Sequence, residues 1–328
     1  MQSMQSSANE FAEVFKFRFD AATQASDGPA GKVSAVVADA EQRAITHVAV
    51  KLGVFFGASH YVPLNLVADA NADQLSLSIP LAEIIKLPTS APAGAVLSSS
   101  TSLVAAGKRL GHLTQLTINR ETRILRHLVV DRAVRGEALV PASMIVTMTS
   151  KQIGVNLGTA TAQSLVPYRR DADLHAEAHA AIYDYEPLRI DLPGIEIHAI
   201  DGVIWLKGHV SSDLNQRLVS DQLQGITGLD ELHNELIADT DLAGRISMAL
   251  GRDPRTAGQK IGVYPQLGIV RLRGNVRTPE ARAAAGEIAS VVPGVKRLEN
   301  ELHVDPHADV VPVMAGVTNS EDVVPGGG

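Results

Sequence analysis

The chain has no cysteine among its 328 residues, and only 4% of the residues are aromatic. The lack of cysteine excludes a disulfide framework, a thiolate metal site and a cysteine nucleophile, and it fits a reducing compartment. The first 20 residues hold no basic segment followed by an apolar one, so we expect no secretory signal. No apolar run approaches the roughly 20 residues that span a bilayer. We therefore expect a soluble, cytoplasmic protein.

Motifs of catalysis are also missing. The sequence has no G-x-S-x-G, no P-loop and no G-x-G-x-x-G after a predicted strand. His175 and His179 stand four residues apart, a spacing at which two imidazoles can share a zinc ion, but no third ligand is evident. A solvated start of a helix is the alternative interpretation of these two histidines. The sequence predicts no enzyme, no cofactor and no metal site.

Charge is distributed unevenly along the chain. Residues 101–170 hold 10 Lys and Arg against 3 Asp and Glu, a net charge of +7, whereas residues 171–328 hold 13 against 24, a net charge of −11. The whole chain carries −7. The basic segment could pair with the acidic one inside the protein, or it could face an anionic partner.

The C-terminal half contains an internal repeat at an offset of 66 residues. The segment "GVIWLKG" at 202–208 aligns with "GIVRLRG" at 268–274, and "GLDELHNEL" at 228–236 aligns with "GVKRLENEL" at 294–302. Each copy reads as helix, strand, alternating strand, helix and strand. The expected order is αββαβ, with the helices on one face of a three-stranded sheet. We expect the first helices to be N-capped by Asp173 and Asp241.

The N-terminal half repeats as well, at an offset of 80 residues that later becomes 78. "GKVSAVVADAEQRAITHVAV" at 31–50 aligns with "GHLTQLTINRETRILRHLVV" at 111–130. His47 and His127 occupy matched positions, where they could sense pH or bind metal, or could merely bond a neighbouring backbone group. Several short strands with turn residues between them predict a small closed β-barrel in each copy.

The predicted fold is thus multidomain, with two small all-β barrels followed by two α+β modules. We expect the chain to divide into an N-terminal extension, four domains and a disordered tail, with boundaries at 1–12, 13–90, 91–168, 169–238, 239–305 and 306–328.

These segments resemble two known families. The first β-rich repeat is similar to PRC-barrel domains through "DGPAGKVSAVVAD", "ITHVAV" and "YVPLNLV", and the second through "GHLTQLTI", "RHLVV" and "LVPASMI". The second repeat lacks the Asp-Gly turn at its entry. The C-terminal repeats resemble BON domains through "GVIWLKGHV" and "GIVRLRGNV" with the segments that follow them. The resemblance implies no enzyme. PRC-barrels dock onto other proteins, and a phospholipid-binding role has been proposed for BON modules.

Alternation along the repeated strand marks a candidate interaction surface. If Ile204 and Leu206 point to the helices, Trp205 and Lys207 point to the opposite face of the sheet, and the second copy carries Arg271 and Arg273 there. Trp205, the only tryptophan, suits a protein interface or a lipid headgroup region, and the paired arginines could hold phosphate or carboxylate. Internal or homo-oligomeric burial of this face is the alternative.

A second candidate surface is the longer connection in the first β-rich repeat, which contains Phe55 and Phe56. Adjacent aromatics at a loop tip could dock on a partner, insert shallowly into a membrane or fold over the barrel.

The sequence as a whole predicts a non-catalytic, homo-oligomeric scaffold or adaptor, with protein partners or a second copy favoured and no small-molecule substrate evident. Tandem weak sites raise avidity without new chemistry. Peripheral binding to membrane phospholipid is one alternative. Association with RNA or the ribosome through Arg120, Arg123, Arg126, Arg132 and Arg135 is another, against which overall acidity and scarce aromatics weigh.

Overall fold

The computed structural model describes residues 14–53, 57–158, 164–308 and 314–315. Its backbone contacts divide the chain into two compact units. The first comprises Met1–Leu174 with the short segments Ala199–Gly202 and Thr227–Asp230, and the second comprises the remainder. The four-domain division is finer than this and remains a prediction.

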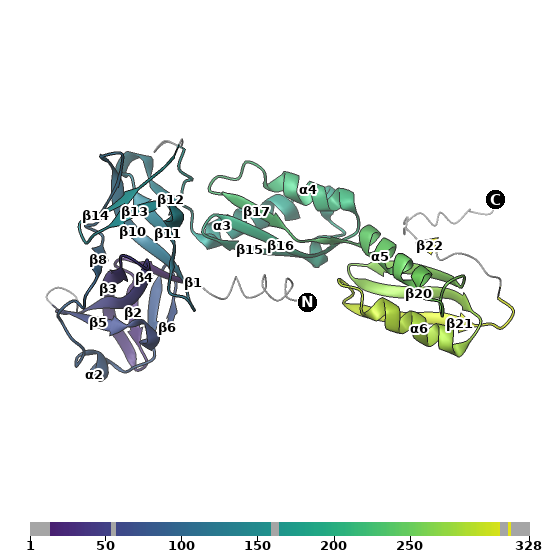
Figure 1. Cartoon of the computed structure of the whole chain (residues 1–328). Coiled ribbons are helices and arrows are strands. Elements are labelled where there is room, and N and C mark those ends of the chain that lie inside the picture. The colour runs from purple at the N-terminus through teal and green to yellow at the C-terminus, as the bar shows by residue number, and fades with distance from the viewer. Residues whose placement is uncertain (1–13, 54–56, 159–163, 309–313, 316–328) are drawn as a thin grey trace. The chain divides into compact units, whose positions relative to one another are not determined.

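The first unit is built from two β-rich repeats, drawn in purple and blue in Figure 1. The strands are β1 (Val14–Arg18), β2 (Ala22–Ala25), β3 (Gly28–Asp39), β4 (Ala44–Leu52), β5 (Ser59–Pro63), β6 (Val67–Ala70) and β7 (Gln74–Leu77), then β8 (Ala95–Ser98), β9 (Ser102–Ala105), β10 (Lys108–Asn119), β11 (Leu125–Asp131), β12 (Glu137–Pro141), β13 (Ile145–Met148) and β14 (Gln152–Val155). Short helical turns are η1 (Leu64–Leu66), α2 (Leu81–Ile84), η2 (Ala133–Arg135) and η3 (Ala142–Met144).

The two repeats have the same strand order, which confirms the duplication. The first reads β5-β4-β3-β2-β7-β6 and the second β12-β11-β10-β9-β14-β13. The prediction of closed barrels is wrong for the described residues, because no pairing joins β5 to β6 or β12 to β13. The long strands β3 and β10 are bent by bulges, so the two halves of each strand have different neighbours.

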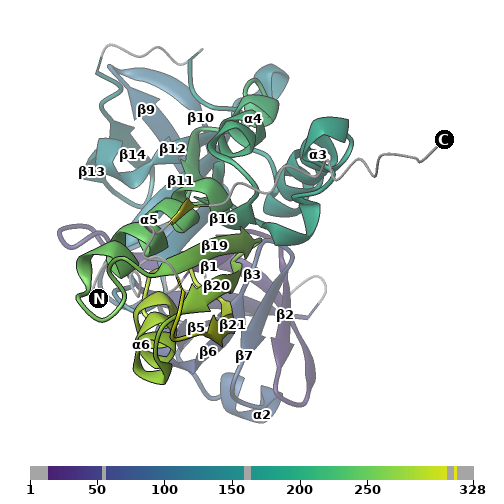
Figure 2. The same cartoon turned by 90° about the vertical axis from the view of Figure 1, so that its right-hand side faces the viewer.

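The repeats exchange one strand each. β1 precedes the first repeat but pairs with β10 of the second, and β8 precedes the second repeat but pairs with β3 of the first. The exchange obeys the 80-residue offset, since Arg18 lies opposite Gln115 and Ser98 lies opposite Ala35. Figure 1 shows β1 at the junction of the two repeats, and Figure 2 shows β9 and β14 of the second repeat above β2 and β7 of the first.

A local two-fold relation connects the repeats. The Ile45 amide donates to the Arg123 carbonyl, and the Leu125 amide donates to the Arg43 carbonyl, both at 2.9 Å. These two bonds are copies of each other at an offset of 80, as in a symmetric dimer interface. One continuous hydrophobic core runs through both repeats, from Phe15 to Leu165. The two β-rich repeats therefore form an intramolecular dimer.

The second unit contains the second αββαβ repeat and most of the first, whose residues 171–174, Ala199–Gly202 and Thr227–Asp230 belong to the first unit. The first copy consists of α3 (Asp171–Tyr183), β15 (Ile195–Ile200), β16 (Val203–Val210), α4 (Asp213–Leu223) and β17 (Glu231–Asn234). The second consists of α5 (Asp239–Arg252), β19 (Lys260–Gln266), β20 (Ile269–Val276), α6 (Pro279–Ser290) and β21 (Arg297–Val304). Minor elements are η4 (Glu186–Leu188), η5 (Leu192–Gly194), β18 (Ile237–Ala238) and β22 (Met314–Ala315). The predicted αββαβ order is confirmed.

Helix packing and capping follow the sequence closely. Val270 and Leu272 are fully buried in one core with residues of α5 and α6, as predicted. Ser212 and Thr278, matched at an offset of 66, cap α4 and α6 by accepting from the amides three residues on. The predicted caps at Asp173 and Asp241 are wrong, because α3 and α5 begin two residues earlier. Most of the predicted tail lies outside the described residues, and no described helix has the length and apolarity of a membrane span.

Candidate functional site

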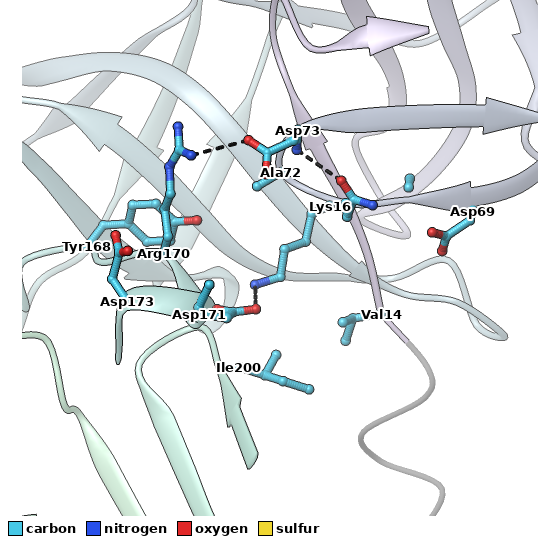
Figure 3. A pocket seen from close by; sticks show the side chains of 13 residues that line it. Val14, Lys16, Asp69, Ala72, Asp73, Tyr168, Arg170, Asp171, Asp173 and Ile200 are labelled. Atoms are coloured by element: carbon cyan, nitrogen blue, oxygen red, sulfur yellow. Dashed lines mark hydrogen bonds and ion pairs between the residues drawn. The ribbon is translucent and has the colours of Figure 1, made fainter. Parts of the chain in front are cut away.

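A buried ammonium group lies at the centre of the candidate site. Lys16 extends from the exchanged strand β1 and is only 6% exposed. Its Nζ donates to Asp171 Oδ2 at 2.5 Å and to Asp201 Oδ1 at 2.7 Å. Figure 3 shows the Lys16 side chain among the residues that line a cavity, directed at Asp171. Asp171 and Asp201 lie 155 and 185 positions after Lys16 in the chain, so the cluster joins distant segments of the first unit.

Asp201 occupies a tight turn and is 2% exposed. Asp201 and Gly202 both have positive φ, 49° and 80°, as a two-residue hairpin turn requires. His127 Nδ1 lies 3.5 Å from the second carboxylate oxygen. Burial favours the protonated acid, but the neighbouring His127 and the charge of Lys16 overcome it and hold the pKa of Asp201 well below 3.8.

Asp171 is the first residue of α3 and accepts from the Asp201 amide at 2.9 Å. Burial raises the pKa of Asp171, and Lys16 opposes this only in part. In the second copy Asp239 accepts from the Leu267 and Gly268 amides at 2.6 and 3.1 Å. A carboxylate in the first helical turn thus holds the hairpin turn in both copies. This contact explains why both helices begin before the predicted caps.

A cavity of about 480 Å³ opens beside Lys16. Arg170 at its rim forms an ion pair with Asp73, 3.3 Å between Nη1 and Oδ1. Tyr168 lines the wall, and burial raises the pKa of its hydroxyl, which lies 3.1 Å from Gln115 Nε2. Figure 3 shows that each cation drawn in this cavity faces a carboxylate.

The charges of Lys16 and Asp201 are held fixed and are not poised for proton transfer. Burial alone lowers the pKa of Lys16, but Asp201 and Asp171 outweigh it and raise the pKa above 10.5. A catalytic lysine needs the opposite shift, towards neutral pH. Lys16 and Asp201 therefore both stay charged at neutral pH. The arrangement suits a structural tie better than acid–base catalysis.

The site belongs to one half of the internal dimer only. At an offset of 80, Lys16 corresponds to Val96. Asp201 corresponds at an offset of 66 to Leu267, so the hairpin turn itself does not require a carboxylate. The cation and its carboxylate partner thus both stand where the duplicate copies carry apolar residues.

Trp205 is 7% exposed and stacks on His233, with ring centroids 5.1 Å apart. The alternative of internal burial is therefore the one the structure favours for this residue. Lys207 is partly buried and lies 3.9 Å from Glu235 across the neighbouring strand.

The arginines at the matched positions also pair across strands. Arg271 Nε donates to Glu299 at 2.6 Å, and Arg273 Nε donates to Glu301 at 2.7 Å. The pair Trp205 with His233 therefore corresponds at an offset of 66 to the pair Arg271 with Glu299. The two copies differ by a whole cross-strand pair, which accounts for the change from tryptophan to arginine.

The remaining predicted sites fall in different places. Phe55 and Phe56 lie outside the described residues. His47 Nδ1 lies 3.0 Å from the Thr46 hydroxyl. The rings of His175 and His179 stack 6.2 Å apart. No group of three or more metal-ligating side chains occurs within the described ranges.

The basic segment is used in part inside the first unit. Arg120 donates to the Ala68 carbonyl at 2.9 Å and lies over the Phe15 ring. Arg170 forms an ion pair with Asp73 of the first repeat at 3.3 Å. Two arginines of residues 101–170 are thus engaged inside the first unit.

Comparison with protein families gives one match. Residues 238–306 form a BON domain. This segment contains α5 through β21, and it starts one residue before the predicted 239–305 module. No curated protein matches the chain.

Two of the solved structures that match this chain illustrate a partial similarity. Both are of CdsD, a structural protein of the type III secretion system of Chlamydia trachomatis, the second being its C-terminal domain. They share 18% and 17% identity over 40% and 42% of this chain, each with a TM-score of 0.34. The matches span 61% and 66% of those chains.

Proposed function

We propose that this protein is a non-catalytic scaffold or adaptor that assembles through its outer surfaces and forms a homo-oligomer. The observation that carries the proposal is the Lys16 cluster. Its Lys16 and Asp201 are engaged in ion pairs between distant segments, and the pKa shifts of these two groups keep both charged near neutral pH. In this proposal, the Lys16 and Asp201 side chains stabilise the fold of the first unit and do not take part in catalysis.

The finer identity of the modules is part of the proposal. We assign residues 13–90 and 91–168 as PRC-barrel-like domains, on the quoted motifs and the shared strand order. We assign 169–238 as a second BON-like domain, because its αββαβ order repeats that of 238–306. A cytoplasmic location is in keeping with the lack of cysteine.

The sheet face of the second αββαβ copy is our candidate surface for assembly. Arg273 is 58% exposed and Glu301 44% exposed, and together they border a groove of about 680 Å³ that also includes Arg282 and His303. Alternating charges on such a face favour self-complementary contacts between two copies.

Sedimentation velocity over a wide concentration range tests this proposal. We expect a mass that is a multiple of one chain. The charge swap R273E/E301R keeps the pair within the chain but reverses its outward pattern, so we expect it to shift the equilibrium towards monomer. The swap E186R/R189E, an exposed pair outside both sheets, serves as the matched control. A single-chain mass at every concentration would contradict the homo-oligomer.

The two alternatives have less support. Trp205, which favoured a lipid surface, is buried, and Arg120, which favoured RNA, contacts Ala68 and Phe15. Flotation with anionic vesicles and a gel shift with RNA, both at low salt, test them directly.

A further inference from the structure

A second cavity opens on the first β-rich repeat and is separate from the Lys16 site. It encloses about 650 Å³, within the range of small-molecule sites. Leu52, Leu81 and Ile85 form its apolar wall above the buried Ala30 and Val33. Ile85 is 55% exposed although it is a large aliphatic side chain. The cavity therefore offers apolar surface that nothing in the described chain covers.

Two lysines stand together at this cavity. Lys32 of β3 and Lys51 of β4 are direct cross-strand partners, and both line the cavity and are exposed. Directly opposed residues of an antiparallel pair project on the same face, so like charges there repel each other. Neither ammonium group has an ion pair or hydrogen bond within the part of the chain that the structure describes. Asp20 is the one carboxylate among the lining residues, so the lining carries a net charge of +1.

The second repeat shows that the fold does not demand this lysine pair. At an offset of 80 the matched cross-strand partners are His112 and Asp131. Arg109, matched to Pro29, lies 3.0 Å from the His112 ring nitrogen. Leu52 of the apolar wall is matched by Arg132. The second repeat thus has mixed polar groups where the first combines two cations with an aliphatic wall.

We propose that this cavity binds a small amphiphilic anion. A carboxylate or phosphate head lies between the ammonium groups of Lys32 and Lys51 and relieves their repulsion. An unbranched aliphatic tail lies along Leu52, Leu81 and Ile85 and removes their exposed surface from water. The site takes a free amphiphile from solution. It is independent of the assembly surface proposed above, so either proposal can fail without the other.

Isothermal titration of the full chain with decanoate, below its micelle concentration, tests the proposal. We expect saturable binding with one ligand per chain, and much weaker binding of acetate, which has the head alone. Decyl phosphate is expected to bind at the same site and to compete with decanoate.

The variant Lys51→Asp introduces the residue that the second repeat carries and removes the like-charge pair. We expect it to weaken decanoate binding by about tenfold or more while leaving the thermal transition unchanged or raised. Lys151→Asp, the same change at an exposed site in the second repeat, is the matched control and should bind like the natural chain. Absence of saturable decanoate binding, or equal binding by both variants, would overturn the proposal. Binding to phosphatidylglycerol vesicles without binding to monomeric decanoate would also overturn it, because the ligand would then be a membrane surface.

Discussion

At the scale of single residues, the main finding is that duplicated positions have diverged in linked pairs. Lys16 replaces the apolar residue of the matched position Val96, and its partner Asp201 stands where the other copy has Leu267. Lys16 without Asp201 would keep only Asp171, and Asp201 without Lys16 would keep only His127. Removing one partner of a buried ion pair costs several kcal/mol. The cation and the carboxylate therefore depend on each other.

Replacing Lys16 by methionine should destabilise the first unit strongly. The change leaves the buried Asp201 and the half-buried Asp171 without their cation, at a cost of about 3–5 kcal/mol. We expect the melting temperature seen by circular dichroism to fall by at least about 6 °C, since 1 kcal/mol corresponds to about 2–4 °C at this size. Val96→Met, the same new residue at the matched position, should change it by much less. Equal shifts for the two variants would contradict the account.

The difference in melting temperature between the natural chain and Lys16→Met should also depend on alkaline pH. The pKa of Lys16 is raised on folding, so its stabilisation is complete below the ordinary value of 10.5 and is lost as the pH rises through the folded value. The gap in melting temperature between the natural chain and Lys16→Met should therefore shrink above about pH 10.5. A gap that is constant to higher pH would mean that the Lys16 charge adds nothing to stability.

Trp205 provides a spectroscopic test because it is the only tryptophan. With 7% exposure and His233 stacked on it, we expect blue-shifted emission and slow quenching by acrylamide. Unfolding in urea should shift the emission to the red. Red-shifted, readily quenched emission from the native chain would restore the open interface as the better interpretation of this face.

Predictability at the residue scale was uneven. Alternation correctly placed Trp205 and Arg271 at equivalent positions, but it could not show which neighbour covers each side chain. The Asp201-Gly202 turn could be predicted, whereas the burial of its carboxylate could not, because Lys16 lies 185 residues away. The signal that was available is a lysine within the alternating "VFKFR" of β1.

At the scale of elements, the two αββαβ repeats share an asparagine that bridges the last helix and the last strand, as well as the order of their helices and strands. Asn234 of β17 donates to the Gln216 carbonyl of α4, and its side-chain oxygen accepts from the Leu236 amide. Asn300 of β21 does the same with Arg282 and Leu302, each matched at an offset of 66. The asparagine of each "NEL" segment joins the last helix to the last strand.

Alanine at either asparagine should have a similar effect. Asn234→Ala and Asn300→Ala each remove two hydrogen bonds, one from the side-chain amide to a helix carbonyl and one from a backbone amide to the side-chain oxygen. At about 0.5–1.5 kcal/mol for each bond, we expect each variant to lose about 1–3 kcal/mol. Urea unfolding followed by circular dichroism measures this. Ser290→Ala, which removes only an exposed bond to the Glu287 carbonyl, is the control. A loss of unfolding free energy no larger than that of the control would mean that these asparagines do not stabilise the contact between the last helix and the last strand.

Element order could be predicted because helix and strand periodicities differ and each copy supports the other. Strand pairing could not. The repeat alignment begins at Gly31 and Gly111, so β1 and β8 carried no recognised repeat signal, and Phe15 has little in common with Ala95 at the matched position. Strand exchange depends on which repeat each strand pairs with, and the local sequence of a strand contains no information about that.

At the scale of the whole molecule, the β-rich repeats are one body and not two barrels in series. The exchanged strands, the two-fold pair of hydrogen bonds and the single core all connect them. A symmetric body made by one chain presents each surface twice, with differences only where the copies have diverged. Those differences, at Lys16 and at the Lys32–Lys51 cavity, are where we place the structural tie and the proposed ligand site.

Disulfide trapping tests the strand exchange most directly, and the lack of natural cysteine leaves no competing thiol. Ala35 and Ser98 lie opposite each other if β8 pairs with the first repeat, whereas Ser98 would face Gln115 if it paired with its own repeat. We predict that A35C/S98C forms the disulfide on oxidation and S98C/Q115C does not, as measured by free-thiol mass spectrometry. A disulfide in S98C/Q115C and none in A35C/S98C would contradict the intramolecular dimer.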